Sequence, residues 1–267
     1  DFIHYFLGQH GKPVFSLFDR ASFGFETYPV YQLEIDGIRT TDLSVYLQKI
    51  NLLPSIPNKA TDVIIGMDLG YTEPTAIAIM YLDAYKILRF HARVKLTKVS
   101  YPIQEKLIDI IDSKFGPSII GIDKGNIGIS VIQNLWEHKD YIHKDYRKVI
   151  FPIDYSSSIV LGTDSDGVEV KSKTKPFAVT TLQDYTNNHK IIYSTTDMAM
   201  VVELERMTYT KTPTGDIVYK TLTPKGGQRG EDHFTSALLC GVTAYYMNNE
   251  FIFGNRGKKK LFKPSWV

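Results

Sequence analysis

Apolar residues occur in short runs separated by turns, and two of these runs flank a single turn near residue 70. Residues 62–68 form an apolar, β-branched run that ends in an aspartate, and residues 76–81 form the next run after a Gly/Thr/Pro turn. Two such runs around a short turn predict an antiparallel hairpin. Asp68 would then end a buried strand, where an ionised carboxylate is costly unless cations or hydrogen-bond donors meet it.

Downstream of this hairpin, short apolar runs alternate with segments of helical periodicity. A second aspartate, Asp123, ends the short apolar run 118–123, and a glycine again follows within two residues. The further predicted elements are a strand within 85–97, a helix over 100–114, a helix over 127–139, a strand over 148–154, a helix over 177–187, a strand over 189–194, a helix over 197–207 capped at Thr196 or Asp197, and a helix over 231–248. This order predicts an α/β fold, a mixed sheet with helices on its faces.

Two further hairpins are predicted in polar parts of the chain. Asp166-Gly167 separates the runs 159–161 and 168–170, and a Pro-Thr-Gly-Asp turn separates 209–211 from 217–221. Turns of this composition between apolar or β-branched runs are typical of hairpins that project from a domain.

The two ends of the chain differ from its middle. Residues 1–60 are rich in aromatic residues but lack sustained periodicity, apart from a short helix near 41–50 that Thr41 or Asp42 can cap. The last residues, 251–267, carry five basic residues and no acidic one. We therefore expect an N-terminal segment and linker over 1–60, a folded domain over 61–249 and a basic tail over 250–267.

Composition narrows the class of protein. Hydrophobic residues make up 43% of the 267 positions, which is enough for a folded core. The single cysteine excludes a disulfide framework and a cysteine-rich zinc site. The sequence contains no run of about 18 apolar residues, which is the pattern that would predict a membrane-spanning helix. Because the chain begins at Asp1 without a methionine, we expect it to be a piece of a longer polypeptide.

Three carboxylates are candidates for one site. If the strands that end in Asp68 and Asp123 are parallel neighbours, both side chains emerge at the same edge of the sheet. Asp232 lies in the first turn of the last predicted helix, after a glycine-rich loop. Each aspartate alone is typical of a turn or a helix start. Together they would repel one another unless hard cations such as Mg²⁺ or Mn²⁺ neutralised them.

The segments 66–70, 122–128 and 230–238 carry these aspartates, and together they resemble the nuclease domain of tailed-phage terminase large subunits. That domain has a ribonuclease H-like fold, and the resemblance covers roughly residues 61–249, including Val202-Glu203-Leu204 and the hairpin after it. It implies metal-dependent cutting of double-stranded DNA concatemers during genome packaging.

The resemblance implies Asp68, Asp123 and Asp232 as catalytic metal ligands. We expect two Mg²⁺ or Mn²⁺ ions, with Asp68 bridging both because it comes from the central strand. Two such ions clamp the attacking and leaving oxygens of a phosphoryl transfer. The family often has two adjacent aspartates in the last motif and another acid three positions on, where this chain has His233 and Ser236. We expect Glu231 or His233 to substitute as a ligand.

Basic residues near these motifs are candidate DNA contacts. Lys124 is a candidate for the scissile phosphate, and the candidates for the DNA backbone are Lys171, Lys173, Lys175 and Arg229. The three lysines between 171 and 175 fit a solvated loop edge equally well.

The resemblance also implies partners and a location. We expect a packaging ATPase domain in the same full-length chain, ahead of Asp1, and the portal and small terminase subunit as further partners. The protein would act in the host cytoplasm and transiently on the procapsid. In agreement, this chain has no Walker-type phosphate loop of its own.

Three alternatives remain open from the sequence. Residues 68–72 also match the phosphate-binding hairpin of actin-like and sugar-kinase ATPases, which would bind ATP. A ribonuclease H-like junction resolvase would prefer branched DNA. A non-catalytic docking module with a vestigial acidic site would gain no thermal stability from Mn²⁺.

Overall fold

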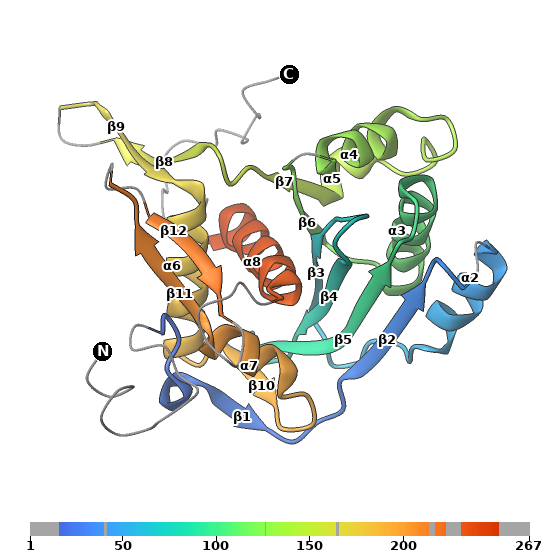
Figure 1. Cartoon of the computed structure of the whole chain (residues 1–267), viewed down its shortest axis with the longest axis horizontal. Helices are drawn as coiled ribbons and strands as arrows, with labels where there is room; N and C mark the ends of the chain where they lie inside the picture. The colour runs from blue at the N-terminus through green and yellow to red at the C-terminus, as the bar shows by residue number, and fades with distance from the viewer. Residues whose placement is uncertain are drawn as a thin grey trace.

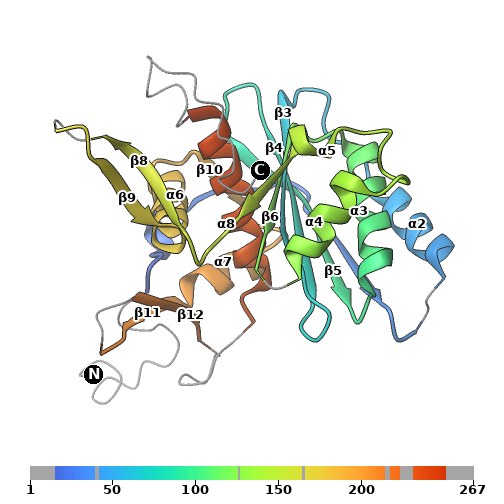
Figure 2. The ribbon, with the colours of Figure 1, turned by 90° about the horizontal axis from the view of Figure 1, so that it is seen from above.

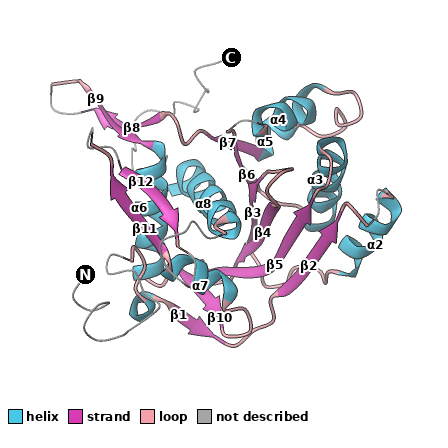
Figure 3. Ribbon diagram, in the orientation of Figure 1, coloured by secondary structure: helices cyan, strands magenta, loops and turns pink. Residues whose placement is uncertain are grey.

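A mixed sheet with helices on both faces forms the centre of the molecule (Figures 1 and 3). The computed structural model describes residues 16–39, 42–125, 127–163, 166–213, 217–222 and 231–250. In these residues the sheet has eight strands in the order β1-β10-β5-β4-β3-β6-β7, with β2 also paired to β5. Its strands are β1 (Gly24–Glu26), β2 (Tyr31–Asp36), β3 (Asp62–Asp68), β4 (Thr75–Leu82), β5 (Leu88–Thr97), β6 (Ile119–Asp123), β7 (Ile150–Ile153) and β10 (Ile191–Ser194).

The predicted central hairpin is confirmed. Strands β3 and β4 pair antiparallel from Asp62 opposite Leu82 to Asp68 opposite Ala76. On its other side β3 pairs parallel with β6, and Met67 lies opposite Ile122. The two strands that end in aspartates are therefore parallel neighbours, which is the condition under which both side chains emerge at one edge of the sheet.

Each face of the sheet has its own layer of helices, seen edge-on in Figure 2. One layer consists of α2 (Leu43–Leu52), α3 (Tyr101–Phe115), α4 (Gly128–Glu137) and the short α5 (Tyr146–Val149); the other consists of α6 (Thr174–Asn187), α7 (Ala199–Glu205) and α8 (His233–Tyr245), which a π-helical turn extends over Tyr246–Glu250. Side chains of β3 alternate between the layers: Ile64 packs in the α8 core, and Ile65 and Met67 pack in the α3 core. This alternation follows from the period of two along a strand.

Helix α8 lies directly on the backbone of the sheet. A Cβ atom added at Gly66 would overlap the carbonyl oxygen of Ala237 and lie 2.7 Å from the nitrogen of Gly241. At Gly121 an added Cβ would overlap the carbonyl oxygen of Cys240. Only glycine permits so close an approach of helix and strands. The glycines in β3 and β6 therefore fix where α8 lies.

The N-terminal segment contributes two strands to the same sheet, although residues 1–60 lack sustained strand periodicity. Strand β2 pairs parallel with β5 over six residues, and β1 pairs parallel with β10. Both strands are short, and their partners lie far away along the chain. Residues 1–15 fall outside the described part.

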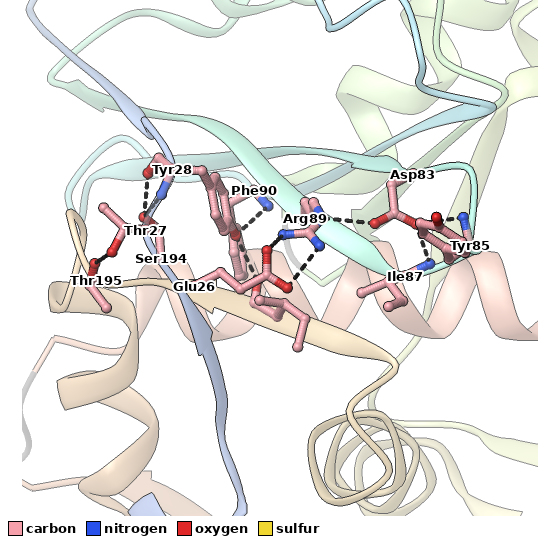
Figure 4. A network of polar contacts seen from close by, with 11 residues as sticks. Glu26, Thr27, Tyr28, Asp83, Tyr85, Ile87, Arg89, Phe90, Ser194 and Thr195 are labelled. Atoms are coloured by element: carbon pink, nitrogen blue, oxygen red, sulfur yellow. Dashed lines mark hydrogen bonds and ion pairs between the residues drawn. The ribbon is translucent and has the colours of Figure 1, made fainter.

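A network around Arg89 fastens β1 to the sheet (Figure 4). The guanidinium of Arg89 donates to both carboxylate oxygens of Glu26 at 2.7 and 3.1 Å, and its Nε donates to Asp83 at 2.8 Å. The hydroxyl of Tyr28 donates to the carbonyl of Ile192 at 2.6 Å. These contacts tie β1 to β5 and β10.

Both outer hairpins are confirmed. They are β8 (Ser158–Thr163) with β9 (Glu169–Lys173), and β11 (Met207–Lys211) with β12 (Ile217–Thr221). Figure 2 shows β8 and β9 beside α6, and β11 and β12 beside α7. None of the helices in the described residues has the length and apolar character of a membrane span.

The start of α7 differs from the expected cap at Thr196 or Asp197. The N-cap residue is Met198, which has no capping side chain. Asp197 cannot serve because its buried carboxylate accepts two hydrogen bonds from Arg93 of β5. For α2 the expectation is confirmed, since Asp42 accepts a hydrogen bond from the amide of Ser44 at 2.9 Å.

Candidate active site

A cleft of about 530 Å³ opens where β3, β6 and the start of α8 meet, and Asp68, Asp123 and Asp232 all line it. Asp68 and Asp123 are the last residues of β3 and β6, and Asp232 is the N-cap residue of α8. The parallel register of β3 and β6 brings the first two to the same edge. The close contact of α8 with both strands brings Asp232 to this edge as well.

Asp123 is half-buried and lies within the electrostatic influence of Asp68. Its Oδ1 accepts a hydrogen bond from the amide of Gly125 at 2.8 Å. Burial raises the pKa of Asp123, and the negative charge of Asp68 raises that pKa further. The two carboxylates thus repel each other, and a cation between them would relieve this repulsion.

His233, the first residue of α8, contacts the carboxylate of Asp68. Its Nδ1 lies 3.2 Å from Asp68 Oδ2, and its Nε2 lies 3.6 Å from Glu73 Oε2. The hydrogen bond to Asp68 raises the pKa of His233, and the charges of Asp232 and Glu73 add to this effect. The imidazole therefore lies between two carboxylates, and all three residues line the cleft.

In this structure the three carboxylates do not form a complete metal coordination site. Among the residues that the structure describes, no three His, Cys, Asp or Glu side chains converge closely enough to hold a metal ion. The donors nevertheless fit a hard divalent cation in kind, because they are carboxylate oxygens from three elements on one cleft. Asp68, Asp123 and Asp232 are the residues that could hold it.

The other predicted ligand and the candidate phosphate contact have partners elsewhere. Glu231 is exposed, and its carboxylate accepts a hydrogen bond from Lys95 at 3.2 Å. Lys124 donates to Asp154 at 3.2 Å. Neither residue lines the cleft, whereas the predicted residue His233 does.

The predicted DNA-contacting lysines lie on or beside β9. Lys175, in the first turn of α6, lines the cleft, and its ammonium group stacks over the ring of Tyr155 at 4.0 Å. Lys171 pairs with Glu169 at 3.0 Å on the same strand, and Lys173 is exposed at the strand end. Arg229 and the basic tail lie outside the described residues.

Several cleft residues escaped the analysis of the sequence. Glu73 lies in the turn after Asp68, Tyr101 begins α3, and Lys220 lies on β12. Glu73 lies only five residues after Asp68, so an acid in a turn beside a candidate ligand was the available signal. Lys220 had no such signal, because only the fold brings β12 to the cleft.

No protein family model matches the sequence, and no curated protein matches it either. Solved structures do match. The large terminase nuclease from thermophilic phage G20c with bound cobalt superposes with a TM-score of 0.55 at 13% identity, over 86% of this chain and 98% of that one. The structure of the G20c nuclease with bound magnesium gives a TM-score of 0.52 at 15% identity, over 71% and 83%.

The chain has the fold of a large terminase nuclease domain. The large terminase of a second thermophilic bacteriophage gives a TM-score of 0.50 at 12% identity, over 91% of this chain and 48% of that one. This chain thus corresponds to about half of that longer protein. The predicted resemblance and the ribonuclease H-like fold class are confirmed.

Proposed function

We propose that this terminase nuclease fold is a divalent-metal-dependent endonuclease that cuts double-stranded DNA during viral genome packaging. The observation that carries the proposal is the shared cleft of Asp68, Asp123 and Asp232, which come from three different elements. A local role in a turn or at a helix start would not explain why three acids so far apart in the sequence line the same cleft. Asp68 and Asp123 repel each other, and a cation-binding role would explain why the two charges are kept close together.

Asp68, Asp123 and Asp232 would hold Mg²⁺ or Mn²⁺, and two ions fit the number of carboxylates. The bound cations would supply Lewis acidity, which lowers the pKa of water and offsets the charge on the phosphoryl oxygens. Similar proteins were solved with cobalt and with magnesium bound, which supports a divalent site.

The chain's own residues would bind and orient the DNA. Lys175 and Lys220 line the cleft and can meet phosphates. Tyr71 presents a half-exposed ring at the same cleft, and the ammonium group of Lys98 lies 5.6 Å from its centre. The proposed chemistry is hydrolysis, with water as the nucleophile.

The proposed role in genome packaging rests on the same structural similarity to large terminases. The longer large terminase, from the second thermophilic bacteriophage, has about twice the matched length, and it was also solved in complex with ATP-γ-S. A packaging ATPase domain in the same full-length chain is thus part of our proposal. So are the portal and the small terminase subunit as partners, and action in the host cytoplasm on the procapsid.

Plasmid cutting tests the proposal. We expect wild-type protein to nick or cut supercoiled DNA without sequence preference when Mn²⁺ or Mg²⁺ is present, and to stop when EDTA is added. Asp68→Asn abolishes the activity, whereas Asp140→Asn, at an exposed acid that does not line the cleft, leaves it intact. Unchanged cutting by Asp68→Asn would contradict the site. A preference for branched over linear DNA would instead favour a junction resolvase.

A further inference from the structure

The first turn of α8 is capped by a residue from another helix. Asp232 is the N-cap residue, yet its side chain makes no capping hydrogen bond. Instead, Glu203 of α7 accepts hydrogen bonds from the amide of Thr235 at 3.0 Å and from the hydroxyl of Thr235 at 3.2 Å. Thr235 is the third residue of the helix, and its amide is one that an N-cap aspartate ordinarily satisfies.

Helix α7 is anchored so that Glu203 reaches this amide. Arg93 of β5 makes a buried two-point ion pair with Asp197, just ahead of α7. The same guanidinium lies 4.5 Å from the ring centre of Phe234, the residue before Thr235. One arginine thus joins the strand, the start of α7 and the start of α8.

This arrangement has a consequence for Asp232. A carboxylate at the N-cap is drawn to the first amides of its own helix, because they are otherwise unsatisfied. Glu203 already satisfies the amide of Thr235, so that amide does not draw the Asp232 carboxylate. Asp232 is one of the residues that line the acidic cleft.

We propose that Glu203 is a positioning residue: by capping α8 in place of Asp232, it keeps the Asp232 carboxylate directed to the cation cleft. The proposal rests on the proposed metal-dependent function. Glu203 itself does not line the cleft. It acts only through Thr235 and the helix start, so its loss affects cation binding without removing a cation ligand.

Calorimetric titration of metal-free protein with Mn²⁺ tests the proposal, with Glu203→Leu as the main variant. We expect Glu203→Leu to weaken Mn²⁺ binding about fivefold or more, since an N-cap contact of ordinary strength then competes for Asp232. Glu203→Gln keeps an oxygen acceptor for Thr235 and restores affinity to near the wild-type value. If Glu203→Leu does not fold, Glu203→Asp, which is one methylene too short, takes its place with the same expected loss.

Glu205→Leu is the matched control, because Glu205 lies on the same helix but its carboxylate lies 3.8 Å from Arg20. Equal losses in the two leucine variants would mean a general disturbance of α7 and would overturn the proposal. Wild-type affinity in Glu203→Leu, or no restoration by Glu203→Gln, would also overturn it.

A crystal structure of metal-free Glu203→Leu provides a readout that does not depend on cation binding. We expect the Asp232 carboxylate to accept the hydrogen bond from the Thr235 amide; an unmoved Asp232 would overturn the proposal. If wild-type protein fails to bind Mn²⁺ at all, the proposed function fails, yet this structure still decides whether Glu203 and Asp232 exchange capping roles.

Discussion

Substituting Gly66 by alanine tests whether direct contact between α8 and the sheet builds the cleft. A Cβ at this position would overlap the carbonyl oxygen of Ala237 and lie 2.7 Å from the nitrogen of Gly241. Both atoms belong to the backbone of α8, so no side-chain rotation relieves the overlap. The helix must therefore move away from β3, and it carries Asp232 and His233 with it.

The size of the effect follows from these contacts. Cβ atoms in proteins essentially never come within 3.0 Å of such atoms, so α8 must retreat by about 1 Å. Overpacking of this kind costs about 1–3 kcal/mol of unfolding free energy. A misplacement of about 1 Å at a reacting centre lowers the rate about 100-fold. We thus expect Gly66→Ala to lose far more activity than its stability loss explains.

Two assays separate the two effects: urea denaturation for stability, and plasmid cutting with Mn²⁺ well below the melting temperature. Gly116→Ala is the control, because Gly116 has a φ of +57° at the end of α3 and no atom within 4 Å of an added Cβ. This variant loses about 1 kcal/mol through backbone strain but keeps its activity. Wild-type stability and cutting in Gly66→Ala would refute the proposed role of the contact.

Three further predictions concern buried charges and histidines. Asp197→Ala leaves Arg93 buried without its partner and costs about 3–5 kcal/mol in urea denaturation, and a loss below about 1 kcal/mol would contradict a buried pair. Burial lowers the pKa of His91, so the unfolded state binds the proton more readily and the melting temperature falls as the pH drops below 6.5; His91→Phe flattens this slope. The pKa of His233 is raised by Asp68, so its contribution to stability is present at acid pH and is lost as the pH rises through that raised value. NMR titration should find a lower His233 pKa in Asp68→Asn, and an unchanged pKa would contradict the contact.

Local patterns predicted the centre of the fold. The runs on either side of residue 70 gave the β3–β4 hairpin, because the signal lies within about twenty consecutive residues. The aspartates that end β3 and β6 were found for the same reason. Their juxtaposition needed only one further assumption, that the two strands are parallel neighbours.

Features that depend on distant partners were missed. Strand β2 is recognisable only through β5, which lies some sixty residues further along the chain. Asp197 resembles a helix cap in the sequence, but Arg93, 104 residues away, binds its carboxylate. Likewise, nothing near Glu203 indicates that it caps α8. Local propensity cannot show which of two available partners a carboxylate takes once the chain is folded.

Anomalous diffraction from wild-type crystals soaked in Mn²⁺ tests the central claim most directly, because it locates the cation itself. We predict a peak within coordination distance of the carboxylates of Asp68, Asp123 and Asp232, and the loss of this peak in Asp68→Asn. An empty cleft at saturating Mn²⁺, or a peak that persists in Asp68→Asn, would contradict the claim that these acids form a cation site.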